Sequence, residues 1–334
     1  MDYRTPGRSD LKVSPLCLGT MMFGGQTDEI ASQRIVARAK DGGVNFIDTA
    51  DTYNGGRSEE VVGRALGNSR NDFVLATKVA NTIEGVAGSG GLSAKWIAQA
   101  ANDSLKRLRT GHIDLYYLHK EDHGVPLAET IGAVAKLIAA GKVRYFGVSN
   151  YKGWRIAEIC RLCDEMGIAR PAVSQPYYHA MYRAVETEHL PACGYFGLGV
   201  VSYSPLARGL LTGKYAPGAA PAADSRAGRG DKRILQTEFQ PHALDVAQKI
   251  VAHAKKRGVT PAQFAIGWVL ANRFMTGVIG GPRTEAQWDD YLKSLDYKPD
   301  AEDEDFINSL VAPGHPAVPG YNDPAYPIEG RKLK

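Results

Sequence analysis

The segment Asn45-Phe-Ile-Asp-Thr-Ala-Asp-Thr-Tyr-Asn54 reads as a short buried strand that runs into a polar loop. The two residues after Asn45 are apolar and typical of strands, and Asp48 ends the strand with a carboxyl group. Tyr53 follows in the loop. The segment therefore predicts two titratable groups close to the carboxyl end of one strand.

Two later apolar runs also end on titratable side chains. Phe73-Val-Leu-Ala-Thr-Lys78 ends on a lysine, and Ile113-Asp-Leu-Tyr-Tyr-Leu-His119 ends on a histidine. A parallel β/α barrel carries its chemistry at the carboxyl ends of its strands, so these groups would meet at one mouth. The sequence predicts an active site formed by Asp48, Tyr53, Lys78 and His119.

Strand and helix patterns alternate along the chain. Strands are expected near residues 15–19, 45–49, 73–77, 113–118, 143–148, 172–175, 199–203 and 276–280. Helices are expected at 32–41, from an N-cap at Ser58 onward, and at 93–108, 126–140, 152–166, 185–195, 242–257, 261–271 and 284–294. Eight such units match a closed (β/α)8 TIM barrel. We predict an α/β fold of this kind, one domain over residues 1–334, with an N-terminal β-hairpin and a C-terminal extension.

An open doubly wound sheet is the alternative architecture. It would place a Gly-x-Gly-x-x-Gly turn directly after the first strand to hold phosphates. The chain has Gly19-Thr-Met-Met-Phe-Gly24-Gly25 there, which lacks that spacing. The barrel is therefore preferred.

Composition excludes several classes of partner. The formal charge of +4 over 334 residues is too small to indicate nucleic-acid binding. No apolar run reaches the length of a membrane span, and the polar N-terminus has no secretory leader. The four cysteines have no framework spacing, which favours a reduced, cytoplasmic setting. We expect a small-molecule substrate, no nucleic acid and no membrane.

The four predicted site residues suit proton transfer. Tyrosine has a pKa near 10 in water, so it is a poor acid or base at neutral pH unless a cation stabilises the phenolate. Lys78 is the expected cation, and Asp48 would keep it charged and oriented. A neutral His119 would hold a carbonyl oxygen while Tyr53 delivers the proton.

Several longer motifs resemble those of the aldo-keto reductases. They are the segment from Asn45 through Gly63, Ser104-Leu-Lys-Arg-Leu through His119, Gly141-Lys-Val-Arg-Tyr-Phe-Gly-Val-Ser-Asn150, and Tyr203-Ser-Pro-Leu-Ala-Arg-Gly-Leu-Leu-Thr-Gly-Lys-Tyr215. The chain is most similar to the bacterial branch related to the potassium-channel β-subunits. The resemblance implies a (β/α)8 barrel that binds NADP(H) and reduces aldehydes and ketones. It also implies that Tyr53 is the general acid, that Lys78 and Asp48 lower its pKa, and that His119 orients the carbonyl group.

The resemblance further implies the cofactor contacts. Ser149, Asn150 and Gln175 match the residues that hold the nicotinamide carboxamide, and Tyr203 matches the aromatic residue that stacks on the nicotinamide ring. The loop expected to lie over the pyrophosphate contains Ser204, Leu206, Arg208 and Lys214. Further contacts are assigned to Thr20, at the end of the first strand, and to Arg226, near the adenosine.

Gly280-Gly281-Pro282-Arg283-Thr284 is a glycine-rich turn that opens a helix, which is a suitable anion site. Gly281 would contribute backbone, and Arg283 would pair with a 2′-phosphate, which predicts a preference for NADPH over NADH. Thr284 and Gln287 also read as a capping box, and both roles of Gln287 are compatible. Asp290 is assigned to the same cofactor region, although the family usually has Glu-Asn in place of Asp290-Tyr291.

Further residues are candidates for the substrate pocket or for a metal site. The residues expected to line the pocket are Met22, Tyr53, Trp96, His119 and Tyr151, with Phe23, Tyr177 and Tyr178 as further aromatic candidates. The pair Cys160 and Cys163 lies within a helix pattern, and His119 and His123 leave a strand for a loop, so no metal site is predicted.

The proline-rich tail, residues 313–327, reads as irregular structure that either straps the surface or borders the substrate mouth. A slow redox-sensor module and a metal-dependent hydrolase on a barrel remain alternative functions. His119 argues against the sensor, because channel β-subunits often have Asn at that position.

Overall fold

The computed structural model describes residues 1–327 and divides the chain into two compact units. The first unit consists of Met1–Pro176, Glu188–Tyr203 and Phe274–Leu292. The second consists of Tyr177–Thr187, Ser204–Arg273 and the described residues from Lys293 onward. The prediction of one domain over residues 1–334 stays a prediction.

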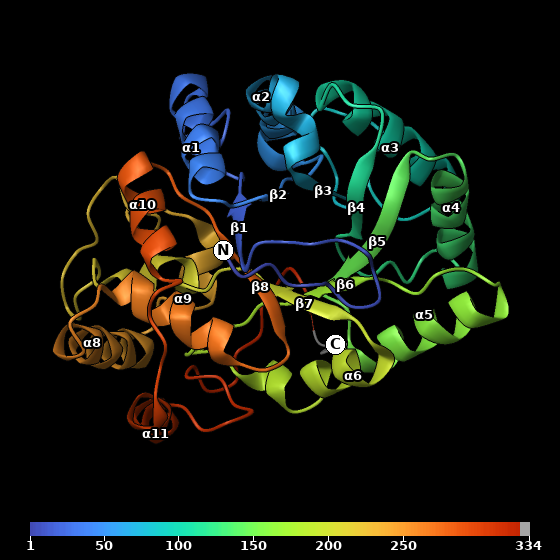
Figure 1. The fold of residues 1–334 in the computed structure, drawn as a ribbon. Helices are drawn as coiled ribbons and strands as arrows, with labels where there is room; N and C mark the ends of the chain where they lie inside the picture. The colour runs from blue at the N-terminus through green and yellow to red at the C-terminus, as the bar shows by residue number, and fades with distance from the viewer. Residues whose placement is uncertain (328–334) are drawn as a thin grey trace. The chain divides into compact units, whose positions relative to one another are not determined.

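The first unit contains a complete barrel of parallel strands (Figure 1). The strands are β1 (Leu16–Gly19), β2 (Phe46–Asp48), β3 (Val74–Val79), β4 (Ile113–Leu118), β5 (Val143–Ser149), β6 (Val173–Gln175), β7 (Gly199–Ser202) and β8 (Met275–Gly280). They pair in chain order, and the barrel closes where Leu16 of β1 pairs with Val278 of β8. The predicted (β/α)8 fold is confirmed.

Helices follow one another around the strands of the first unit, and successive helices pack together from α1 to α6. They are α1 (Glu29–Asp41), α2 (Arg57–Leu66), α3 (Ala94–Arg107), α4 (Leu127–Ala139), α5 (Gly153–Glu165), α6 (His189–Phe196) and α10 (Glu285–Lys293), with 3₁₀ turns η1 (Tyr53–Gly56) and η2 (Gly67–Asp72). Six of the eight strands are buried along their entire length, as expected for strands covered on both faces. Apolar side chains such as Val13, Phe46, Leu115 and Val201 form the core between them.

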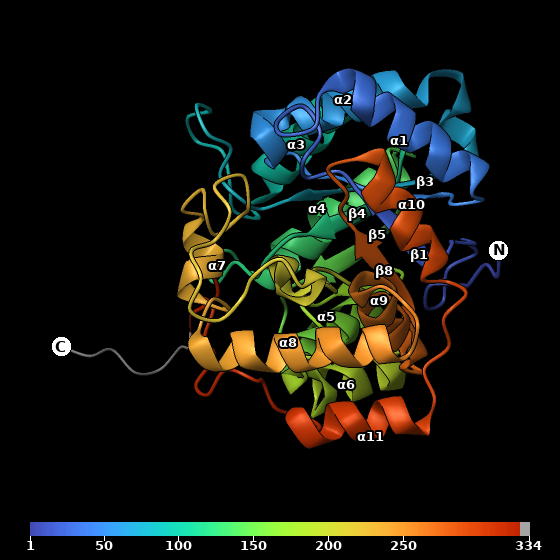
Figure 2. The ribbon, with the colours of Figure 1, turned by 90° about the vertical axis from the view of Figure 1, so that its left-hand side faces the viewer.

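The regular elements of the second unit are helical in the part that the structure describes. Its elements are η3 (Ala184–Glu186), η4 (Ala207–Thr212), α7 (Lys232–Gln236), α8 (Pro241–Lys256), α9 (Pro261–Ala271) and α11 (Ala301–Leu310). Helices α8 and α11 lie side by side (Figure 2), joined by a hydrogen bond of 2.7 Å between His253 Nε2 and Asp303 Oδ1. Within residues 1–327, no helix combines the length and the apolar character that a membrane crossing requires.

Four local expectations need correction. Ser58 does not cap α2: the helix already begins at Arg57 after Gly56, whose φ of 93° only glycine adopts easily, and the Ser58 hydroxyl donates to Thr20 O at 2.8 Å. The N-terminal hairpin is reduced to one bridged pair, Arg4 and Val13.

The helix expected at 185–195 is split into η3 and α6. Pro191 is tolerated only in a first helical turn, and α6 accordingly begins at His189. Helix α11 was not predicted, although Asp300 and Asp303 form a capping box at its start. The tail that follows α11 is irregular apart from an isolated bridge between Pro316 and Tyr182, as predicted.

Candidate active site

Three of the four predicted catalytic side chains meet at the carboxyl ends of β2 and β3. The Lys78 ammonium donates to Asp48 Oδ1, to the backbone carbonyl of Thr49 at 2.9 Å and to the Tyr53 hydroxyl at 3.3 Å. Lys78 has no exposed surface and Asp48 is 2% exposed. A buried ammonium thus joins the carboxylate to the phenol.

Burial alone would lower the pKa of Lys78, because it disfavours the charged form. The charge of Asp48 and the interaction with Tyr53 outweigh that effect and raise the pKa above its usual value. Lys78 is therefore a permanent cation at neutral pH beside the Tyr53 hydroxyl. This is the electrostatic environment that favours a phenolate.

The loop that carries Tyr53 is fixed by polar contacts. Asn54 adopts a left-handed backbone, with φ of 51°, and its amide donates to Met21 O at 3.0 Å and Phe23 O at 2.8 Å. The loop therefore leaves β2 in one defined conformation and is tied to the loop that follows β1.

A second carboxyl group of this loop, Asp51, is completely buried. Burial and the neighbouring Glu59 charge raise its pKa to about 8, against the opposing effect of Arg107. Glu59 itself accepts from Thr77 Oγ1 at 2.5 Å and from Arg107 Nε at 2.7 Å. At neutral pH Asp51 is therefore mainly a neutral acid, buried within the loop that carries Tyr53.

His119 follows β4 and is held at its backbone and at its ring. Its N–H donates to Val79 O at 2.8 Å, and its carbonyl accepts from Asn150 Nδ2 at 2.9 Å. The ring nitrogen Nδ1 lies 3.0 Å from Asn81 Nδ2, and the ring meets the Tyr53 ring edge-on at a centroid distance of 6.1 Å. The structure thus brings the fourth predicted catalytic residue to the other three.

The residues predicted to hold the nicotinamide form one array with the catalytic group. Gln175 Nε2 donates to Asp48 Oδ2 at 2.9 Å, and Ser149 Oγ donates to Gln175 O at 2.8 Å. Asn150 Nδ2 donates to Ser149 Oγ at 3.0 Å, and Asn150 Oδ1 accepts from the Tyr203 hydroxyl at 2.7 Å. Amide and hydroxyl groups can both donate and accept, which fits a carboxamide. When a carboxamide binds, its hydrogen bonds would replace some of the hydrogen bonds between these side chains.

The turn after β8 has the open backbone expected of an anion site. Among residues 1–327, a side chain added at Gly281 would come within 4 Å of Gly19 O alone, at 3.9 Å. The Arg283 N–H donates to Gln287 Oε1 at 2.7 Å, and the Gln287 N–H donates to Thr284 Oγ1 at 3.3 Å. The capping interaction of Thr284 with Gln287 is therefore present, while the carboxamide oxygen of Gln287 binds Arg283 instead. Asp290 lies further along α10, and its cofactor role stays a prediction.

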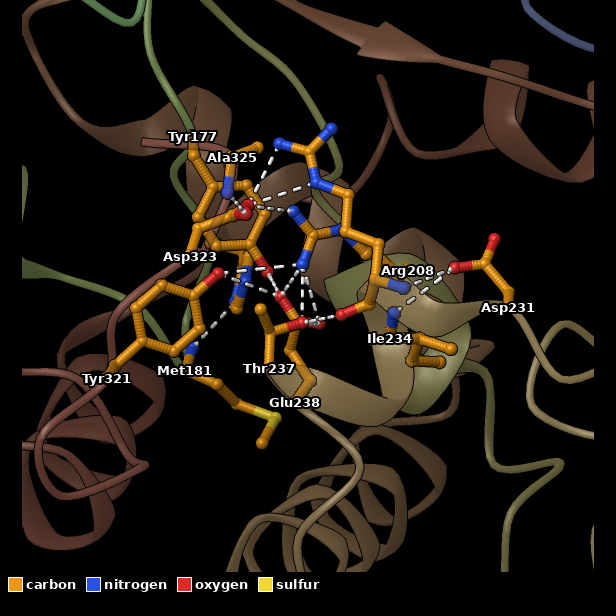
Figure 3. Close-up of polar contacts among 12 residues, drawn as sticks. Tyr177, Met181, Arg208, Asp231, Ile234, Thr237, Glu238, Tyr321, Asp323 and Ala325 are labelled. Atoms are coloured by element: carbon orange, nitrogen blue, oxygen red, sulfur yellow. Dashed lines mark hydrogen bonds and ion pairs between the residues drawn. The ribbon is translucent and has the colours of Figure 1, made fainter. Parts of the chain in front are cut away.

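The predicted phosphate-loop residues lie in the second unit, and one of them is the centre of a buried charged network (Figure 3). Arg208 Nη1 contacts Glu238 Oε1 at 2.5 Å and Thr237 Oγ1 at 2.7 Å, and Nη2 contacts Asp323 Oδ2 at 3.0 Å. Its guanidinium carbon lies 4.8 Å from the centre of the Tyr177 ring. A phosphate would have to displace one of these carboxylates from the Arg208 side chain.

The other cations of this segment also have partners. Arg226 Nε contacts Asp231 Oδ2 at 2.7 Å, and Lys214 Nζ lies 5.3 Å from the centre of the Tyr215 ring. Ser204 adopts a left-handed backbone with φ of 57°, and Leu206 precedes η4. The cofactor contacts predicted for these residues stay predictions.

The predicted substrate residues differ in exposure. Met22 is half-buried in the loop after β1, close to Thr20, whose hydroxyl donates to Asp48 O at 3.1 Å. Trp96 and Tyr151 are buried, and burial raises the pKa of Tyr151. Their contact with a substrate stays a prediction.

Asn81 was missed by the sequence analysis, because an asparagine after a strand reads as a turn residue.

The Aldo/keto reductase family model matches residues 15–312 of this chain. An uncharacterized oxidoreductase YrpG of Bacillus subtilis is 38% identical over 322 residues, which is 93% of this chain and 96% of the relative. A probable voltage-gated potassium channel subunit beta of Arabidopsis thaliana is 37% identical over 306 residues, or 90% and 92% of the two chains. Aflatoxin B1 aldehyde reductase member 2 of Rattus norvegicus is 41% identical over 219 residues, or 64% and 58%.

These matches confirm the resemblance that the sequence motifs predicted, including its relation to potassium-channel β-subunits. The matched region contains all eight strands and the four predicted catalytic residues. This chain belongs to the aldo/keto reductase family.

Proposed function

We propose that this oxidoreductase reduces an aldehyde or a ketone to an alcohol with NADPH. The observation that carries the proposal is the buried Lys78 ammonium, which contacts both Asp48 and the Tyr53 hydroxyl. Relatives named as an oxidoreductase and an aldehyde reductase support the same class of reaction.

The cofactor, when bound, supplies the hydride that the carbonyl carbon receives. The chain supplies the rest of the chemistry. Tyr53 gives its hydroxyl proton to the carbonyl oxygen, and Lys78 stabilises the phenolate that remains. His119 donates a hydrogen bond to the same oxygen, where negative charge develops. Asp48 and Gln175 keep Lys78 oriented, because Gln175 Nε2 holds the second carboxylate oxygen at 2.9 Å.

Ser149, Asn150 and Gln175 would hold the carboxamide, and Tyr203 would stack on the nicotinamide. Arg283 and Arg226 support NADPH rather than NADH as the cofactor. A charge-assisted contact with a 2′-phosphate contributes about 1.5–3 kcal/mol, or roughly 10- to 150-fold in affinity. Titration of the intrinsic protein fluorescence with both cofactors measures this difference, and equal affinities would contradict the assignment.

The test of the reaction is a screen of aldehydes, ketones and sugars, followed by the loss of NADPH absorbance. Tyr53→Phe keeps the ring and removes the proton donor, so the rate should fall by about 10²-fold or more. Tyr195→Phe is the matched control, because Tyr195 is 82% exposed and lies in α6. No turnover with any carbonyl compound, or equal rates for Tyr53→Phe and Tyr195→Phe, would refute the proposal.

A second candidate is a cofactor-binding regulatory module with slow turnover. Relatives named as potassium channel β-subunits favour it. His119 favours the enzyme instead, because it supplies a second hydrogen-bond donor for the carbonyl oxygen. Tight NADPH binding combined with negligible turnover across the screen would support the module.

A further inference from the structure

The hydrogen bond between Asn81 and His119 determines which nitrogen of the imidazole carries the proton. The Asn81 amide nitrogen lies 3.0 Å from His119 Nδ1. An amide nitrogen donates and has no lone pair to accept, whereas a neutral imidazole has one donor and one acceptor nitrogen. Nδ1 must therefore accept, and the hydrogen must lie on Nε2.

We propose that Asn81 is a positioning residue that fixes His119 as its Nε2–H tautomer. This inference rests on the proposed function, in which His119 donates a hydrogen bond to the substrate carbonyl. The Nδ1–H tautomer would present a lone pair on Nε2 to the carbonyl oxygen, and two acceptors repel. With its amide nitrogen toward the ring, as in the structure, Asn81 disfavours the form of His119 that cannot assist the reaction.

Backbone hydrogen bonds fix the positions of both Asn81 and His119. Ala80 links Lys78 and Val79 of β3 to Asn81 and adopts φ of 123°, a strained conformation for a residue with a side chain. Its carbonyl accepts from Gly91 N–H at 2.9 Å, which fixes the turn. His119 is fixed by Val79 on one side and by Asn150 on the other. Strain at Ala80 is consistent with a requirement for one orientation of Asn81.

Asn81→Asp reverses the hydrogen bond while preserving the shape of the side chain. A carboxylate only accepts, so it demands a hydrogen on Nδ1. Neutral His119 then has a lone pair on Nε2, and reduction at pH 8 should fall by about 10²–10³-fold, the effect of losing one preorganised donor to a developing oxyanion. The loss should appear in kcat more than in KM, because that hydrogen bond strengthens in the transition state.

The loss in Asn81→Asp should reverse at lower pH. Protonated imidazole carries a hydrogen on both nitrogens, so Nε2 donates again once His119 is charged. The titratable groups on β2, β3 and their loops are Tyr53, whose ring meets that of His119, Lys78, which contacts the Tyr53 hydroxyl, and Asp48, which contacts Lys78. Lys78 stays charged over this range because its pKa is raised. The ratio of wild-type to variant rate should therefore shrink on going from pH 8 to pH 5.5.

The tautomer itself is measured without turnover. Two-bond ¹⁵N–¹H correlation spectra distinguish the two neutral forms, and the His119 signal is identified by its absence in His119→Gln. Wild-type protein at pH 8 should show hydrogen on Nε2, and Asn81→Asp should show hydrogen on Nδ1. This readout is independent of the substrate, so a wrong tautomer refutes the inference, whereas a correct tautomer without any carbonyl turnover refutes only the proposed function.

Two controls isolate the imidazole. In a His119→Gln background, Asn81→Asp should add no pH-dependent loss, because no tautomer remains to reverse. Thr82→Asp adds the same charge at an exposed neighbouring residue and should leave the rate and the His119 spectrum unchanged. A pH-dependent loss that persists in the His119→Gln background, or an equal loss in Thr82→Asp, would overturn the proposal in favour of a simple charge effect.

Discussion

Lys78→Met should strongly destabilise the fold, because it removes one half of a buried ion pair and keeps most of the side-chain volume. The remaining Asp48 would keep one described donor from a side chain, Gln175 Nε2, and would lose its counter-charge. Removing one partner of a buried pair costs about 3–5 kcal/mol, whereas a similar-sized apolar replacement adds little cavity cost. This corresponds to a decrease of roughly 10²- to 10³-fold or more in the ratio of folded to unfolded protein.

Urea denaturation measures this loss through a double-mutant cycle. With a slope of about 3 kcal/mol/M, the midpoint of Lys78→Met should fall by about 1–1.7 M. Asp48→Asn should cost a similar amount, because it leaves the ammonium buried without its carboxylate. The double variant removes both charges and should recover most of the loss.

The difference in unfolding free energy between wild type and Lys78→Met depends on pH through the raised pKa of Lys78. The folded state holds this proton more tightly than the unfolded state, so the contribution is fully present below the ordinary lysine pKa of about 10.4. It is lost only as pH rises through the higher folded-state pKa. The free-energy difference between wild type and Lys78→Met should therefore stay constant from pH 6 to pH 9. Single-variant costs that simply add in the double variant would show that the pair is not coupled and would refute the reasoning.

Two further predictions concern buried carboxylates. Asp51→Asn should stabilise the fold by several kcal/mol near pH 8 and by little near pH 4. The reason is that the raised pKa of about 8 for Asp51 makes the stability of the wild-type protein fall as pH rises between those values. Urea midpoints at both pH values measure the gain, and an equal gain at both would contradict the prediction. Arg208→Leu should cost about 3–5 kcal/mol at pH 7, since it strands Glu238 and Asp323. That cost should shrink on acidification, because Arg208 lowers the pKa of Glu238 against burial, and Arg233 together with Arg208 lowers the pKa of Asp323. A cost that does not change down to pH 3 would exclude these ion pairs as its source.

The sequence predicted most of the barrel because buried parallel strands are continuous apolar runs, and several of these runs end on or beside a polar residue at the mouth. Asp48, Lys78 and His119 could be identified in this way from local pattern alone. Glu238 and Asp323 could not be assigned to Arg208, because they lie 30 and 115 residues away and no local period relates them. Asn81 gave no signal either, since its importance depends on one hydrogen bond to a residue on the next strand. Ser58 was misread because its hydroxyl packs against Thr20 rather than capping the helix.

Closure of the barrel by β1 and β8 has a consequence for synthesis of the chain. β1 is translated well before its partner β8, which emerges only after Ser204–Arg273 has been made. Until then the hydrogen-bonding edge of β1 is exposed on the ribosome, and pairing of segments so distant in sequence is slow because loop-closure entropy must first be overcome. An unpaired strand edge is prone to associate with other chains. Chaperone capture of nascent chains that end before Met275 is therefore expected to raise the yield of soluble protein.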